Sequence, residues 1–153
     1  MKAGLPPAPA DGTKAARQPD QPVGTLQRVG VEEAGTMYAA AMASLDAAGI
    51  DRAQLEGSSV CPVVKDAGRG FEKVYGRWGG DFLAVTDWGR ATVSAATLAL
   101  LARVLATVLA HLIALGYTVV AVKNTLDLAI DCTVNGGYRN LMVNLKCPRT
   151  GHI

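Results

Sequence analysis

Charged residues are scarce in this chain, and the charges that it has almost cancel. Only 18% of its 153 residues are Asp, Glu, Lys or Arg, and the formal net charge at pH 7 is +2. A charge this small gives no electrostatic basis for binding nucleic acid, so we expect no nucleic-acid partner. Half of the residues are apolar, which excludes wholesale disorder and is enough for one domain with a core.

Cysteine and histidine are also rare. The chain has three cysteines, Cys61, Cys132 and Cys147, without a Cys-x-x-Cys spacing, and only two histidines. The odd number of cysteines and the shortage of histidine argue against a cysteine-rich metal site. We therefore predict reduced, buried thiols in an intracellular protein, cytoplasmic or organellar.

Only one apolar run, residues 104–122 (VLATVLAHLIALGYTVVAV), has the length that crosses a bilayer. Gly116 divides this run into a helix-like and a strand-like half, and Arg103, Thr107 and His111 give the first half a polar stripe. These features favour a buried helix followed by a buried strand, with no membrane partner. The alternative is a membrane-associated structural protein that uses this run.

Residues 1–30 and 31–153 differ in composition. The first segment holds five of the seven prolines and is predicted to be a flexible tail, while the second is predicted to be one folded domain. The periodicity of Ala34, Met37, Ala41 and Leu45 predicts a helix over residues 31–48 that ends at Gly49. A loop is predicted from there to residue 62.

The remaining patterns predict a mixed β-sheet flanked by helices, in an α/β or α+β domain. Helices are predicted over residues 66–78 and 95–115, and strands over 83–94, 117–123 and 139–147. The segment 83–123 would form a right-handed crossover if its strands are parallel. The apolar strand at 117–123 is expected to be covered on both faces. A turn at residues 148–151 predicts a further strand after Ile153, so the domain is expected to be incomplete at its C-terminal end.

A row of cations is the first candidate for function. Lys65, Arg69 and Lys73 share one face of the predicted helix 66–78, where they repel one another unless an anion compensates. A triphosphate is such an anion, and lysine and arginine stabilise the charge that shifts in phosphoryl transfer. The alternative is an ordinary solvated helix face.

Asp87 is the second candidate. In strict alternation it shares a strand face with apolar residues such as Val85, where a carboxylate is costly unless it is paired or bound to a metal. Mg²⁺ held by a carboxylate and substrate phosphates is a natural use of such a residue. Alternatively, a bulge at Gly89 leaves Asp87 at the solvent edge.

The third candidate surrounds two adjacent glycines. Tyr138 follows them and can stack on a purine, with Asn135 and Arg139 as polar neighbours. Lys123 ends the preceding strand, at an edge where α/β sheets often bind ligands. The alternative is a simple hairpin turn with a partly buried tyrosine.

In their order and spacing, these elements resemble the RelA/SpoT-type nucleotidyltransferase domain, which makes guanosine tetra- and pentaphosphate. The resemblance covers about residues 65–153. It rests on the basic row, on residues 86–93 (TDWGRATV), 122–124 (VKN) and 137–141 (GYRNL), and on the closing residues 151–153 (GHI).

The resemblance implies a nucleotidyltransferase-like fold and transfer of the β,γ-diphosphate of ATP to the 3′-hydroxyl of GDP or GTP. By this implication the basic row binds ATP phosphates, Asp87 holds catalytic Mg²⁺, and Tyr138 stacks on guanine. Met142 stands where many synthetases have histidine, and Thr92 where the family has arginine. The alternative is therefore a non-catalytic guanine-nucleotide-binding or regulatory module of the same fold.

Overall fold

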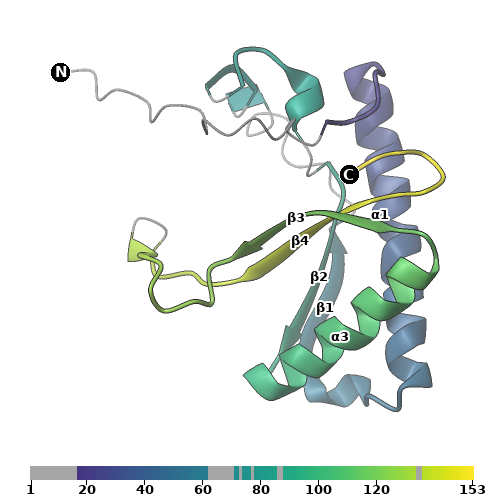
Figure 1. The fold of residues 1–153 in the computed structure, drawn as a ribbon, viewed down its shortest axis with the longest axis vertical. Coiled ribbons are helices and arrows are strands. Elements are labelled where there is room, and N and C mark those ends of the chain that lie inside the picture. Colours follow the sequence, from purple (N-terminus) through teal and green to yellow (C-terminus); the bar gives the residue numbers. More distant parts are fainter. Residues whose placement is uncertain (1–16, 62–70, 73, 77, 86–87, 134–135) are drawn as a thin grey trace.

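Helices and strands are both present in the computed structural model, which describes residues 17–61, 71–72, 74–76, 78–85, 88–133 and 136–153. Figure 1 shows two long helices, α1 and α3, beside two antiparallel ribbons, β1–β2 and β3–β4. The protein is therefore an α+β protein, as the sequence predicts. The described residues form two separate two-stranded sheets in place of the single mixed sheet that we expected.

Helix α1 (Val23–Ala47) begins directly after Pro22, whose carbonyl accepts hydrogen bonds from the N–H groups of Thr25 and Leu26. The predicted boundary at residue 30 is too late, because residues 23–30 belong to this helix. Leu26 is fully buried against Val85 and its neighbours, a non-local contact that the proline-rich local sequence concealed. The predicted end of the helix before Gly49 is confirmed.

Strands β1 (Leu55–Cys61) and β2 (Arg90–Ala95) pair antiparallel, with Leu55 opposite Ala95 and Cys61 opposite Arg90. The predicted loop up to residue 62 is thus wrong, because pairing with β2 satisfies a backbone whose Gly and Ser residues favour a turn locally. The predicted strand 83–94 is also too long. Its first part is a 3-10 helix (Phe82–Ala84), started by a hydrogen bond from the Leu83 N–H to Asp81 Oδ1 at 3.0 Å.

Helix α3 (Leu98–Ala114) confirms the helix predicted in this region. The Thr97 hydroxyl caps its first turn by accepting from the Leu100 N–H at 3.1 Å. The helix packs against α1 in a core cluster, and Leu55 of β1 packs at the margin of this cluster; its buried members are Ala41, Met42, Leu45, Ile50 and Val104. A 3-10 helix (Arg52–Gln54) precedes β1. Among the described residues, no helix has the length and apolar character that a bilayer crossing requires.

Strands β3 (Thr118–Asn124) and β4 (Leu141–Lys146) form the second ribbon, with Thr118 opposite Lys146 and Asn124 opposite Leu141. Because β2 and β3 lie in different sheets, the predicted parallel crossover is not formed. The prediction that this strand is covered on both faces is wrong as well. Every residue of β3 except Val120 is exposed, because the ribbon projects away from the two helices (Figure 1).

The predicted second helix falls partly outside the described residues. Residues 71–72 and 74–76 are helical, and Val74 is fully buried against Leu26. Phe71 and Tyr75 are 46% and 66% exposed. They stack on each other with ring centroids 6.3 Å apart, and both meet the ring of Phe82 edge-on.

Candidate functional site

Three of the predicted site residues, Lys123, Tyr138 and Arg139, lie at the distal end of the β3–β4 ribbon. Lys123 lies near the end of β3 and pairs with Met142. Tyr138 and Arg139 precede β4. The structure therefore brings these three residues to one end of one ribbon. The other predicted site residues are outside the described part of the chain: Lys65, Arg69, Lys73, Asp87 and Asn135.

Arg139 organises the loop that closes this ribbon. Its guanidinium donates to the carbonyl oxygens of Thr125 at 2.9 Å, Asp127 at 2.6 Å and Ile130 at 3.1 Å. Asn140 adds a second set of bonds to Thr125, whose hydroxyl accepts from the Asn140 N–H at 2.7 Å. Because most of its donors are used within the protein, Arg139 holds the loop in shape, a role that the sequence did not reveal.

The turn before Tyr138 is also fixed by hydrogen bonds. Gly136 and Gly137 have φ angles of 66° and 80°, and their N–H groups donate to the carbonyls of Thr133 at 3.0 Å and Cys132 at 2.9 Å. Asp131 accepts from both the backbone and the hydroxyl of Thr133, and these bonds hold the pKa of its carboxyl below its ordinary value. Hydrogen bonds among the described residues therefore shape the backbone that leads to Tyr138.

Tyr138 directly follows this glycine turn. Its side chain is 68% exposed, and Lys123 on the neighbouring strand is exposed too. An exposed aromatic ring provides a platform for a flat base, and an exposed lysine provides a cation for phosphate. The alternative of a hairpin fits the antiparallel pairing of β3 with β4, although Tyr138 is more exposed than that alternative expected.

The described residues contain no group of three or more His, Cys, Asp or Glu side chains arranged to hold a metal ion. The Mg²⁺ site that the sequence suggests thus depends on Asp87, which lies outside them. Cys132 and Cys147 are both buried and free, as predicted for reduced thiols.

A second polar cluster, which sequence reasoning missed, ties the end of β4 to α1. Glu33 is buried on α1, and one carboxylate oxygen accepts from Arg149 Nη2 at 2.5 Å. The other oxygen accepts from Cys147 Sγ at 3.0 Å. Here we call Glu33, Cys147 and Arg149 the Glu33 cluster. A glutamate among the apolar residues of a helix is the one signal that could have indicated it.

Tyr117 and His152 lie beside the Glu33 cluster. Burial raises the pKa of Tyr117, and the neighbouring Cys147 and Glu33 raise it further. His152 is only 3% exposed, and within the described part of the chain neither ring nitrogen has a hydrogen-bond partner.

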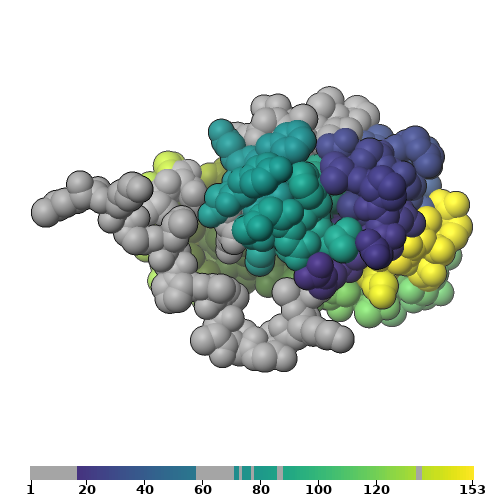
Figure 2. Space-filling model, turned by 90° about the horizontal axis from the view of Figure 1, so that it is seen from above, coloured from purple at the N-terminus to yellow at the C-terminus, as the bar shows by residue number. Residues whose placement is uncertain are grey.

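The segment that carries His152 folds back onto the residues that precede α1. The Cys147 N–H donates to the His152 carbonyl at 2.7 Å, which closes a turn. The Gln18 side chain then donates to the Ile153 carbonyl at 2.8 Å and accepts from the Ile153 N–H at 3.1 Å. Figure 2 shows this C-terminal segment, in yellow, lying against the purple start of the described chain.

The stability of the protein is expected to fall as the pH drops below about 6.5, the ordinary pKa of histidine. Burial lowers the pKa of His152, although the backbone of Thr150 and the nearby Glu33 carboxylate act in the opposite direction. The unfolded chain therefore binds a proton at a higher pH than the folded chain does, and acid favours unfolding. Urea denaturation at pH 7.5 and pH 5.5 measures this dependence.

The His152→Leu variant should lose part of that pH dependence, because it has no group at this site to protonate. A His111→Leu variant on α3 is the control for removing a histidine elsewhere. An equally steep loss of stability with acid in His152→Leu and the wild type would contradict the assignment.

Comparison with known proteins adds no relative: no protein-family model, no curated protein and no solved structure matches the chain. The site therefore has to be interpreted from its own residues.

Proposed function

We propose that this chain is a RelA/SpoT-like domain that binds a guanine nucleotide at the distal end of the β3–β4 ribbon. The observation that supports this proposal best is the 68% exposed ring of Tyr138 on a loop that Arg139 fixes through three carbonyls. A base can stack on this ring without first reorganising the loop, so little conformational entropy opposes binding. Arg139 acts in this site by positioning Tyr138.

The proposed activity is transfer of the β,γ-diphosphate of ATP to the 3′-hydroxyl of GDP or GTP. Lys65, Arg69 and Lys73 would neutralise the phosphates of ATP, and Lys123 those of the acceptor. Asp87 would hold Mg²⁺, which when bound neutralises phosphate charge during the transfer. The proposal of a nucleotidyltransferase-like fold rests on the order of motifs over residues 65–153.

A binding module without turnover is the second candidate. Met142 and Thr92 replace the histidine and arginine that the resemblance leads one to expect. Both positions lie in strands, Thr92 opposite Ser59 and Met142 opposite Lys123. If they carry part of the chemistry in active relatives, binding would persist here while transfer is lost.

Replacing Tyr138 by alanine is expected to weaken guanine-nucleotide binding by about 5- to 100-fold, because one base–aromatic stack contributes roughly 1–3 kcal/mol. Tyr138→Phe keeps the ring and should bind nearly as well as the wild type. Tyr75→Ala removes a tyrosine of similar exposure, 66%, and is the matched control. Titration with a fluorescent GDP analogue measures all four proteins. Wild-type affinity in Tyr138→Ala, or no binding by the wild type, would refute the site.

An assay of labelled ATP with GDP or GTP and Mg²⁺ separates the two candidates. Formation of a 3′-diphosphate product that disappears in Asp87→Ala supports the transferase. Nucleotide binding without product, in a folded protein, supports the binding module.

A further inference from the structure

Helix α3 has an exposed face that contains no polar side chain. Its buried residues, Val104 and Leu112, face the core, and the opposite side of an amphipathic helix is normally polar. Here that side is apolar over an arc of about 120°, at 100° per residue. We call it the alanine face; all its members are exposed, and they are Leu98, Ala99, Ala102, Ala106, Ala110 and Ile113.

The two large residues of the alanine face lie at its two ends. Leu98 is 70% exposed and Ile113 is 53% exposed, so the face carries substantial apolar surface into solvent. Arg103 stands at one margin of the face, and α3 contains no Asp or Glu. A charged peptide, a nucleic acid or an anionic membrane would therefore find no matching row of charges here.

Large and small residues stand at complementary positions about Ala106. Ala99 lies seven residues before Ala106 and Ile113 seven after it, and Ala102 and Ala110 lie four residues on either side. When two such helices cross antiparallel at Ala106, Ile113 of one copy meets Ala99 of the other. The large Ile113 of each copy thus faces the small Ala99 of the other, as packing of two equal surfaces requires.

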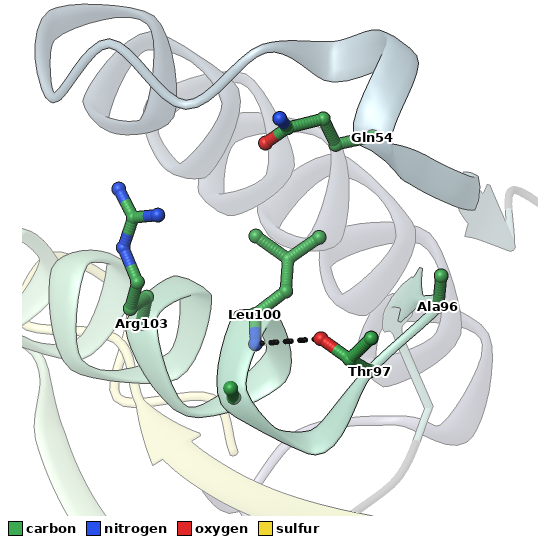
Figure 3. A pocket seen from close by; sticks show the side chains of 6 residues that line it. Gln54, Ala96, Thr97, Leu100 and Arg103 are labelled. Atoms are coloured by element: carbon green, nitrogen blue, oxygen red, sulfur yellow. Dashed lines mark hydrogen bonds between the residues drawn. The ribbon is translucent and has the colours of Figure 1, made fainter.

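A hollow beside Ala99, at the N-terminal end of α3, provides space for a side chain of a second copy. It has a volume of about 470 Å³ and lies between the 3-10 helix Arg52–Gln54 and the first turns of α3 (Figure 3). Its lining residues are Gln54, Ala96, Thr97, Ala99, Leu100 and Arg103. Ile113 of a second copy would approach the rim of this hollow, where Ala99 leaves room for it.

From these observations we infer that the alanine face is the contact surface of a homodimer, in which α3 packs antiparallel on α3 of a second copy. The small side chains at the centre let the two backbones approach to about 8 Å. The apolar ends, Leu98 and Ile113, leave solvent on association and supply the driving force. Each Arg103 stays at the margin, where its guanidinium remains hydrated.

Sedimentation of the full chain tests this inference. The wild type is expected to approach twice its monomer mass of 15.9 kDa as its concentration rises to about 200 μM, a range that covers weak interfaces. Ala106→Glu places two carboxylates against each other on the two-fold axis and should weaken association more than about 10-fold. Ala39→Glu changes an exposed alanine of α1 and should associate like the wild type. Circular dichroism confirms that each variant is folded.

A mixing experiment tests the symmetry itself. Ala106→Glu and Ala106→Lys should each be monomeric alone, and their equimolar mixture should form a heterodimer, because residue 106 faces residue 106 across the axis. A monomeric wild type over the whole concentration range would overturn the inference. So would undiminished association of Ala106→Glu, or a mixture that stays monomeric, since each excludes a two-fold contact centred on Ala106.

Discussion

Gly89→Ala is expected to be the most damaging single substitution in the described part of the chain. A Cβ atom at position 89 would lie 1.9 Å from the carbonyl oxygen of Gly30 and 2.6 Å from its carbonyl carbon. Both are backbone atoms of α1, so neither can rotate away as a side chain could. We expect a loss of about 3 kcal/mol or more in the free energy of unfolding, measured by urea denaturation.

The control for this substitution is Gly35→Ala, also on α1. A Cβ there meets nothing within 4 Å, and alanine is the better helix former, so a gain of up to about 1 kcal/mol is expected. Equal stability of Gly89→Ala and the wild type would show that α1 does not pack this closely against the residues that precede β2.

Arg149→Met is expected to destabilise the fold by about 2–3 kcal/mol, because it leaves the buried Glu33 carboxylate without its cation. The carboxylate side chain is only 8% exposed, whereas Arg149 is 71% exposed, so the cost arises at the glutamate. The double variant Glu33→Gln/Arg149→Met removes the charge as well and should recover part of the loss. Chemical denaturation of the wild type, both single variants and the double variant gives the coupling between the two residues.

An exposed ion pair on the same helix provides the comparison. Arg28 and Glu32 are 2.9 Å apart with side chains 65% and 56% exposed, so Arg28→Met should cost less than about 0.5 kcal/mol. If Arg149→Met costs no more than Arg28→Met, the Glu33 carboxylate is hydrated in solution and the Glu33 cluster does not anchor β4.

Features that depend on neighbouring residues could be predicted from the sequence. Helices α1 and α3 end just before Gly49 and Gly116, as expected. The alternation of Leu141, Val143 and Leu145 identified β4. The helix-then-strand interpretation of residues 104–122 holds for the same reason, since Gly116 breaks the run where α3 ends and β3 follows.

Features that depend on distant residues could not be predicted. β1 has the composition of a turn and becomes a strand through its pairing with β2. The start of α1 depends on Leu26 packing against a cluster more than 45 residues later in the chain, which no local pattern reveals. β3 was expected to be covered because its centre is apolar, but coverage depends on which sheet a strand joins.

The candidate site also combines local features, which could be predicted, with non-local ones, which could not. The strand end at Lys123 and the glycine turn before Tyr138 are local features that the sequence indicates separately. The antiparallel pairing of β3 with β4, which places both at one end of a ribbon, is not local. The three carbonyls that Arg139 binds come from residues 9 to 14 positions earlier, so its structural role became visible only in three dimensions. The Glu33 cluster joins residues 114 and 116 positions apart and was missed entirely.

The bonds between Gln18 and Ile153 have a consequence for the order of folding. They join residues 135 positions apart, and the loop-closure entropy of so long a separation must be overcome before they form. During synthesis α1 leaves the ribosome early, yet Gln18 and Glu33 have to wait for residues 147–153 before they find their partners. We expect the N-terminal half of α1 to acquire its hydrogen-exchange protection last, after the contacts between its C-terminal half and α3 have formed.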